Sequence, residues 1–222
     1  IVFGDWSSDV CSSDLLSREL RTRQVPLLAL AAAFSFVIMM FNMPIPGGST
    51  GHAVGGAIIG IVLGPWAGVI SISVALILQA LIFGDGGITA IAANCFNMAV
   101  VMPFVAYYVY KIISGNSDIR SSKRVAASAI AGYLSLSVAA GLTGFMFGIQ
   151  PLLHTDASGV PLYMPYGLGV TVPAMLIEHV FGFSIIEAIV TALIFAYIQK
   201  TDPTLLMYDQ STSKRSAKGA AA

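Results

Sequence analysis

Between Pro44 and Gly56 the chain reads Pro-Ile-Pro-Gly-Gly-Ser-Thr-Gly-His-Ala-Val-Gly-Gly. This turn separates two long apolar runs, so it places His52 where a hydrophobic segment enters or leaves a membrane. Polar groups at membrane depth are costly and usually mark a ligand or ion site. Irregular backbone is tolerated there only against protein or a water-filled cavity. Because imidazole is a preferred ligand of Ni, Co, Cu and Zn, His52 is a candidate metal ligand.

The composition of the chain predicts its fold class. Of its 222 residues, 56% are hydrophobic and only 10% are charged, and the mean hydropathy is +0.83. Soluble domains carry about 25% charged residues, so we predict an all-α, polytopic transmembrane helical bundle in a lipid bilayer. The net charge of zero offers no electrostatic case for a nucleic-acid partner. Cys11 and Cys95 form neither a disulfide framework nor a CxxC motif.

Hydropathy predicts about six membrane spans. A helix needs about 20 residues to cross the hydrocarbon core. The second span is short enough to be a half-helix, and Pro173 and Gly182 are expected to shape the long last one. The predicted spans are Val25–Phe41, Ala53–Leu63, Trp66–Phe83, Ile88–Ile113, Val125–Gly148 and Leu168–Ile198.

The positions of the basic residues orient these spans. All eleven Lys and Arg residues fall in three groups, within 18–23, 111–124 and 200–218, and six spans place all three groups on one side. The positive-inside rule makes that side, with the C-terminus, cytoplasmic. The connections Pro44–Gly51, Gly84–Gly87 and Ile149–Gly167 contain no Lys or Arg and are expected to face outside, with His52.

The two ends of the chain differ from the rest. Residues 1–15 contain a near-repeat of Ser-Ser-Asp, without the apolar region of a signal peptide. We expect residues 1–15 to be a foreign leader joined to the native chain; a disordered native terminus is the alternative. Residues 16–206 are then the transmembrane domain, and the Ser/Lys/Ala-rich residues 207–222 are a disordered cytoplasmic tail.

Several stretches, taken in order and at their intervals, resemble the NikM/CbiM family. These proteins are the substrate-binding membrane components (S components) of energy-coupling factor transporters for nickel and cobalt. The resemblance covers about Leu16 to Leu206. Its motifs are Phe41–His52, Gly64-Pro65-Trp66, Gln79–Thr89 (Gln-Ala-Leu-Ile-Phe-Gly-Asp-Gly-Gly-Ile-Thr), Ala93–Met98 (Ala-Asn-Cys-Phe-Asn-Met), Pro103–Tyr108 and Val172–Met175.

The resemblance implies a transported metal rather than a bound cofactor or an enzymatic reaction. In the family, four nitrogens hold the metal in a near-planar arrangement. Three come from a Met-His N-terminus, as its amine, a backbone amide and an imidazole, and the fourth comes from the histidine to which His52 corresponds. Such ligation suits Ni(II), and the Pro-Gly-Gly form of the turn favours nickel over cobalt. This sequence has no Met-His start, and the first of the family's usual seven spans is expected to be missing.

The resemblance also implies partners and a location. The expected partners are a T-type transmembrane coupling subunit, ATPase subunits of the ABC type and a small accessory membrane subunit, in the cell membrane of a prokaryote. The chain itself contains no GxxxxGK[ST] motif. The alternatives are a stand-alone metal channel or carrier, which needs a polar path through these apolar spans, and an intramembrane metalloenzyme. Glu178-His179 lacks the second histidine of HExxH.

Four residues could support His52. Asp85 could orient a ligand through a hydrogen bond, or it could simply form an Asx-turn between two helices. Asn94 and Asn97 could bind loop backbone or the His52 ring, or they could join helices to each other. Thr50 lies in the same turn as His52.

The remaining polar residues of interest lie further along the chain. Of the three histidines, only His52 is expected to point into a cavity between the outer loops, and His154 is expected to be solvated in an outer loop. Glu178, His179 and Glu187 form a polar set within the last span, either as a metal relay or, preferably, as a structural pairing.

Overall fold

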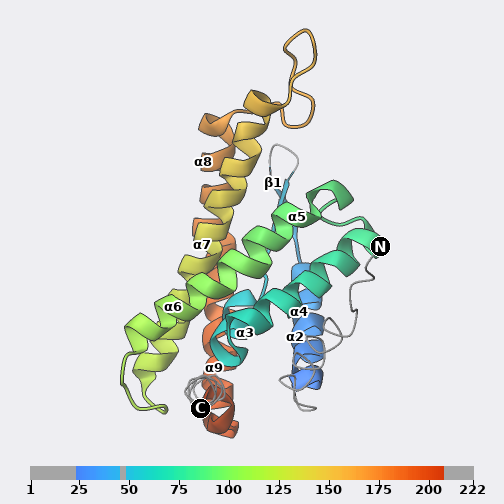
Figure 1. Cartoon of the computed structure of the whole chain (residues 1–222). Coiled ribbons are helices and arrows are strands. Elements are labelled where there is room, and N and C mark those ends of the chain that lie inside the picture. Colours follow the sequence, from blue (N-terminus) through green and yellow to red (C-terminus); the bar gives the residue numbers. More distant parts are fainter. Residues whose placement is uncertain (1–23, 46–48, 208–222) are drawn as a thin grey trace, which may run out of the picture.

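The chain forms a helical bundle with one small hairpin (Figure 1). The computed structural model describes residues 24–45 and 49–207. The leader predicted for residues 1–15 lies outside the described residues, and so does the tail predicted for residues 207–222, apart from Met207, which ends η5. The elements are α2 (Gln24–Met39), β1 (Met43–Ile45), β2 (Ser49–Gly51), α3 (Gly56–Leu63), α4 (Pro65–Leu78), η1 (Gln79–Phe83), η2 (Ile88–Ala90), α5 (Ile91–Asn94), η3 (Cys95–Val101), α6 (Met102–Ser114), α7 (Ser122–Leu153), α8 (Leu168–Glu178), η4 (His179–Phe183), α9 (Ser184–Thr201) and η5 (Pro203–Met207).

The prediction of a polytopic helical bundle is confirmed. Four continuous helical runs are long and apolar enough to cross a membrane, and they are Pro65–Phe83, Ile88–Ser114, Ser122–Leu153 and Leu168–Thr201. They coincide with the last four predicted spans. Within the described residues, the first predicted span is a shorter apolar helix over Val25–Met39, and the second contains only the eight-residue helix α3.

A Gly-Pro pair ends α3 and begins α4. Gly64 has a φ of 92°, which residues with a side chain rarely adopt. Pro65 is the first residue of α4, where the missing N–H of proline leaves no hydrogen bond unmade. The apolar sequence from Gly56 to Leu78 is therefore divided into a half-helix and a spanning helix.

Glycines let the helices approach closely around α7, which packs along α6, α8 and α9. A Cβ atom at Gly144 would lie 2.9 Å from the Thr171 carbonyl oxygen of α8. A Cβ atom at Gly148 would lie 2.6 Å from Cα of Leu168. Contacts this short exclude any larger residue, so these two glycines set the distance between α7 and α8.

The Gly- and Pro-rich turn forms an antiparallel hairpin, in which Met43 pairs with Gly51 and Ile45 with Ser49. Sequence analysis predicted the irregular turn but no strands. Pro44 and Pro46 disfavour a helix here, and the pairing satisfies backbone groups that a helix would otherwise satisfy. The hairpin lies at the end of the bundle opposite the α6–α7 connection (Figure 1).

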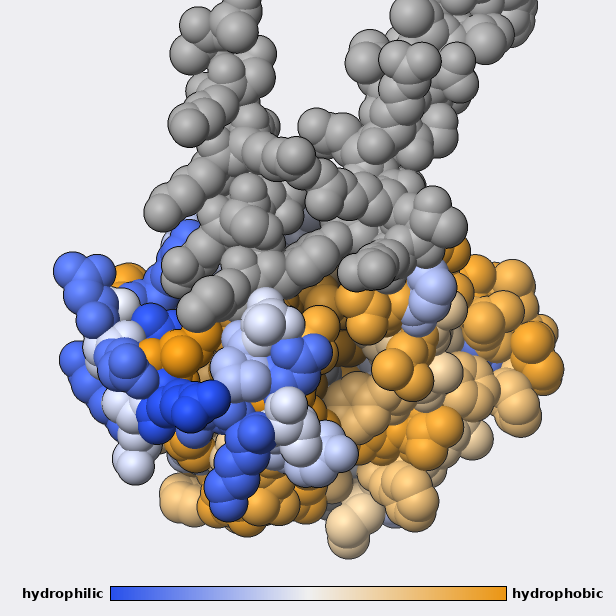
Figure 2. Space-filling model, turned by 90° about the horizontal axis from the view of Figure 1, so that it is seen from below, coloured by the Kyte–Doolittle hydropathy of each residue, from blue (hydrophilic) through white to orange (hydrophobic). Residues whose placement is uncertain are grey.

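The described members of two of the three predicted basic groups lie at the same end of the bundle, and the third group, within 18–23, lies outside the described residues. The α6–α7 connection, with Arg120 and Lys123, lies at the same end as the last turn of α9, which carries Lys200. Viewed from that end, hydrophilic side chains gather on one side and hydrophobic side chains cover the other (Figure 2). Large apolar side chains on the long helices are exposed, including Ile112 (80%) and Phe181 (76%). Such a surface fits contact with lipid rather than water.

Candidate metal centre

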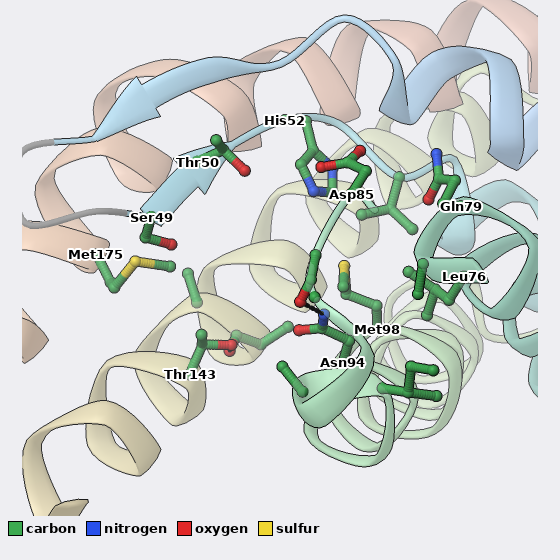
Figure 3. A pocket seen from close by; sticks show the side chains of 18 of the residues that line it. Ser49, Thr50, His52, Leu76, Gln79, Asp85, Asn94, Met98, Thr143 and Met175 are labelled. Atoms are coloured by element: carbon green, nitrogen blue, oxygen red, sulfur yellow. Dashed lines mark hydrogen bonds between the residues drawn. The ribbon is translucent and has the colours of Figure 1, made fainter. Parts of the chain in front are cut away.

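A cavity of about 410 Å³ lies between the hairpin and the helices around it. Figure 3 shows side chains from β2, the Gly84–Gly87 turn, α5 and α7 directed into it. The polar and sulfur-containing side chains that line it are Ser49, Thr50, His52, Gln79, Asp85, Asn94, Met98, Thr143, Met175 and His179. The cavity therefore gathers residues that lie up to 130 positions apart in the sequence.

His52 lies between β2 and α3, half-buried against the cavity. Its Nδ1 lies 3.1 Å from the carbonyl oxygen of Ala53. A hydrogen bond there requires the proton on Nδ1, which leaves Nε2 with a free lone pair. Burial lowers the pKa of His52, while the bond to Ala53 and the negative charge of Asp85 offset part of that effect. Burial thus favours the neutral imidazole, which is the form that binds metal ions.

The backbone that follows His52 is fixed by two fully buried side chains. The Glu187 carboxylate of α9 accepts hydrogen bonds from the N–H groups of Val54 (2.9 Å), Gly55 (2.9 Å) and Ala57 (3.3 Å). Ser35 of α2 donates its hydroxyl to the Val54 carbonyl oxygen at 2.8 Å. Because a carboxylate at the N-terminus of a helix satisfies otherwise free N–H groups, Glu187 anchors the start of α3.

Asp85 lies in a turn whose backbone requires glycine. Gly84, Gly86 and Gly87 have φ values of 68°, 72° and 76°. Asn94 donates its side-chain amide to the Gly86 carbonyl oxygen at 3.2 Å, the dashed line in Figure 3. The Asp85 carboxylate lies beside the His52 ring (Figure 3) and interacts with it electrostatically. The side chain of Asp85 forms no Asx-turn with the residues that the structure describes.

The two asparagines have different surroundings. Asn97 is buried away from the cavity and donates its amide to Thr143 Oγ1 of α7 at 3.0 Å. It joins two helices, which was one of the two roles predicted for it. Asn94 bonds to loop backbone, the other predicted role. Thr50 is exposed and lines the cavity on the hairpin side.

His52 is not alone in the cavity, and the prediction that only this histidine faces it is wrong. His179 lines the same cavity and is only 5% exposed, whereas His154 is exposed in the loop after α7. Glu178, His179 and Glu187 do not hydrogen-bond to one another within the described chain, because Glu187 faces α3 and His179 faces the cavity. The only sequence signal for either role was an ionisable residue inside an apolar span.

Three π-helical turns surround the cavity. They are η1, η3 and η4, and each supplies lining residues, namely Gln79 and Ala80, Met98, and His179. Such turns are rare and occur frequently at functional sites, because the extra residue re-aims the side chains around it.

Across residues 24–45 and 49–207, no group of three or more His, Cys, Asp or Glu side chains is arranged to hold a metal ion.

The fold and the cavity define a multi-pass helical membrane protein with an imidazole-bearing cavity next to its hairpin. A family profile described as the cobalt uptake substrate-specific transmembrane region matches residues 10–205. The chain belongs to this family, CbiM, and the predicted resemblance is confirmed.

Named relatives and solved structures agree with this assignment. The chain is 53% identical over 191 residues to a fused nickel transport protein NikMN of Rhodobacter capsulatus, covering 86% of this chain and 55% of the relative. It is 46% identical over 182 residues to a probable fused nickel transport protein LarMN of Lactiplantibacillus plantarum, covering 82% and 54%. The chain thus spans about half the length of these relatives. A crystal structure of a transition metal transporter superposes with a TM-score of 0.79 at 43% identity, covering 93% of this chain and 89% of that one.

Proposed function

We propose that this chain is the metal-capturing membrane subunit of an energy-coupling factor importer, with Ni(II) favoured over Co(II) as the transported ion. The observation that carries the proposal is the His52 imidazole, whose Nε2 is free and which lines a cavity between the hairpin and the Asp85 turn. Membership of the CbiM family supports transport over catalysis. The names of its relatives include both nickel and cobalt transport.

The chemistry of the cavity suits a transition metal that prefers nitrogen. His52 supplies one neutral nitrogen, and Asp85 supplies negative charge beside it. By resemblance to the family, the other nitrogens come from a Met-His N-terminus that enters the same cavity. Metal–nitrogen bonds are on the order of 2 Å long, so an ion and its ligand atoms occupy only a small part of a cavity of about 410 Å³. The remaining volume has room for a short chain segment. Near-planar nitrogen ligation favours Ni(II) over Zn(II) or Mg(II).

The proposal includes partners and an orientation. A T-type coupling subunit, ABC-type ATPases and a small accessory membrane subunit would supply coupling and energy. The basic end would face the cytoplasm of a prokaryotic cell, and the hairpin with His52 would face outside. The charge difference between the two ends supports this orientation.

Isothermal titration with Ni(II) tests the site. The forms to compare are the 222-residue chain, a form that begins Met-His followed by the family's first helix, and each of these with His52→Ala. We expect tight binding only in the Met-His form with His52 intact. His154→Ala is the matched control, because His154 is exposed outside the cavity. Tight binding that survives His52→Ala would overturn the assignment.

A transport assay tests the energy source. Ni(II) uptake should require the coupling subunit and the ATPases, and it should stop when ATP hydrolysis is blocked. Uptake by this chain alone at the same rate would instead identify a stand-alone carrier.

A further inference from the structure

We propose that an exposed aromatic face of α4 and α6 binds an anionic phospholipid, with the headgroup phosphate on Lys111 and an acyl chain along the neighbouring rings. These rings, called the aromatic ladder below, belong to Trp66, Phe104, Tyr107 and Tyr108. None of the described residues that line the metal cavity belongs to the ladder. The inference is therefore independent of the proposed function.

The aromatic ladder is a continuous row of ring contacts across two helices. Trp66, at the start of α4, meets Phe104 of α6 edge-on, with ring centroids 5.2 Å apart. Phe104 contacts Tyr108 at 6.4 Å, and Tyr108 contacts Tyr107 at 5.4 Å. Trp66 and Tyr108 are 71% and 55% exposed. Because aromatic residues gather where acyl chains meet headgroups in membrane proteins, this exposed row fits contact with a lipid.

Lys111 places a positive charge at the end of the aromatic ladder. Its Nζ lies 4.4 Å from the centroid of the Tyr107 ring and donates a hydrogen bond to the Tyr107 hydroxyl. The ring holds the ammonium group on α6, so a ligand meets a charge that is already in position. An ammonium group has three N–H donors, and it can bond to a phosphate oxygen as well as to a tyrosine.

The length of the aromatic ladder suits an acyl chain as well as a headgroup. Lys111 lies in the last turn of α6, beside the α6–α7 connection (Figure 1). Phe104 lies two turns earlier, about 10 Å along the helix. The rings thus run from the charged end toward the middle of the bundle, over at most about a third of a hydrocarbon core roughly 30 Å thick. A ligand that covers both parts needs an anionic head and an apolar tail.

The charges around Lys111 favour an anionic headgroup over a zwitterionic one. Arg120 and Lys123 are exposed in the adjacent connection and in the first turn of α7. Among the described residues, the carboxylates at this end belong to Asp118 and Asp202, and each accepts a hydrogen bond within its own turn. Positive charge therefore predominates here, and it attracts lipids with a net negative charge.

Quenching of Trp66 by brominated lipids tests the site directly, because Trp6 is the only other tryptophan of the chain. The full chain with Trp6→Phe is reconstituted in mixed vesicles of phosphatidylglycerol and phosphatidylcholine that have the same acyl chains. Bromine is placed on the acyl chains of one lipid at a time. Since bromine quenches only an indole close to it, the fluorescence reports the affinity of the ladder for one lipid relative to the other.

Three variants in this background separate a lipid site from the general charge of the surface. Lys111→Gln removes the charge beside the ladder, and Lys111→Arg keeps it. Lys123→Gln is the matched control, because Lys123 is exposed at the same end but lies outside the ladder. The emission maximum of Trp66 in vesicles without bromine checks that its surroundings are intact in each variant.

We expect phosphatidylglycerol to bind about fivefold more tightly than phosphatidylcholine. Lys111→Gln should abolish this preference, whereas Lys111→Arg and Lys123→Gln should retain it. Equal quenching by the two lipids, or a preference that survives Lys111→Gln, would overturn the proposal. An equal loss in Lys111→Gln and Lys123→Gln would also overturn it, because the preference would then come from the whole basic surface. So would displacement of the lipid by soluble glycerol phosphate, since the site would then recognise phosphate without an acyl chain.

Discussion

The Glu187 carboxylate accepts a hydrogen bond from the backbone N–H of Val54 at a distance of 2.9 Å, across 133 residues of sequence. Val54 is the second residue after His52, so a side chain on α9 fixes the backbone next to the candidate ligand. Ser35 binds the carbonyl oxygen of Val54 from α2. Both backbone polar groups of Val54 are thus held by buried side chains, and His52 is attached to a rigid support.

Replacing Glu187 should therefore affect both stability and metal binding. Glu187→Ala leaves three buried N–H groups without their acceptor, so we expect a loss of about 3 kcal/mol in the free energy of unfolding. Glu187→Gln keeps one acceptor oxygen and should lose less. Both should weaken Ni(II) binding by about tenfold or more.

Equilibrium unfolding in mixed micelles would measure the loss of stability. Ni(II) titration of the form that begins Met-His would measure the loss of metal binding. Glu178→Gln is the matched control, because Glu178 lies in the same helical run, is half-buried and does not line the cavity. If Glu178→Gln were as harmful as Glu187→Gln, the effect would come from charge in this span rather than from anchoring α3.

Asn94 and Asn97 should separate binding from stability. Asn94→Ala removes the bond to the Gly86 carbonyl and loosens the Asp85 turn, so Ni(II) affinity should fall, by about tenfold at most, with little loss of stability. Asn97→Ala removes the bond to Thr143 and should cost about 0.6–1.7 kcal/mol of stability. Its Ni(II) affinity should remain unchanged. The same two measurements apply, and the opposite pattern would place Asn97 rather than Asn94 at the metal centre.

The lowered pKa of His52 predicts a pH dependence of stability. The unfolded chain takes up a proton at this histidine near its usual pKa of about 6.5, whereas the folded chain does so only at lower pH. The unfolded state therefore binds more protons below pH ~6.5, and the free energy of unfolding should fall there by at most about 1.4 kcal/mol per pH unit. Above that pH, His52 should contribute no slope.

Unfolding of the wild-type chain and of His52→Asn from pH 5 to pH 8 checks this sign. The difference between the two curves isolates His52 from every other titrating group. A wild-type chain that becomes more stable than the variant as the pH falls would show that His52 is charged in the folded state.

The proposed orientation can be tested by cysteine labelling. In a chain with Cys11 and Cys95 replaced by Ala, Ala157→Cys and Thr50→Cys place a thiol at exposed positions near the hairpin end. Ser122→Cys places one at the exposed start of α7, at the basic end. In right-side-out vesicles, an impermeant maleimide should label the first two directly and the third only after permeabilisation. Labelling of positions 50 and 122 from the same side would contradict the topology.

Much of this architecture could be predicted from the sequence. The four long helices coincide with uninterrupted apolar runs. The thickness of a bilayer sets the minimum number of consecutive apolar residues in a spanning helix, and such runs can be counted in the sequence. The break at Gly64-Pro65 and the turn at Gly84–Gly87 follow from residues that allow or prevent particular backbone angles. His52 was identified in the same way, because a histidine in a Gly- and Pro-rich turn between two apolar spans is unusual, and its neighbours in the sequence are enough to show it.

Only the tertiary structure showed that Glu187 anchors the start of α3 and that His179 shares the cavity with His52. Both residues lie in one apolar helical run, and hydropathy does not tell which way each of them faces. That direction depends on how α8 and α9 are rotated, which is set by close packing at Gly132, Gly144 and Gly148 of α7 and by the π-helical turn η4. Such contacts join segments far apart in the chain, so they arise only when the helices pack together.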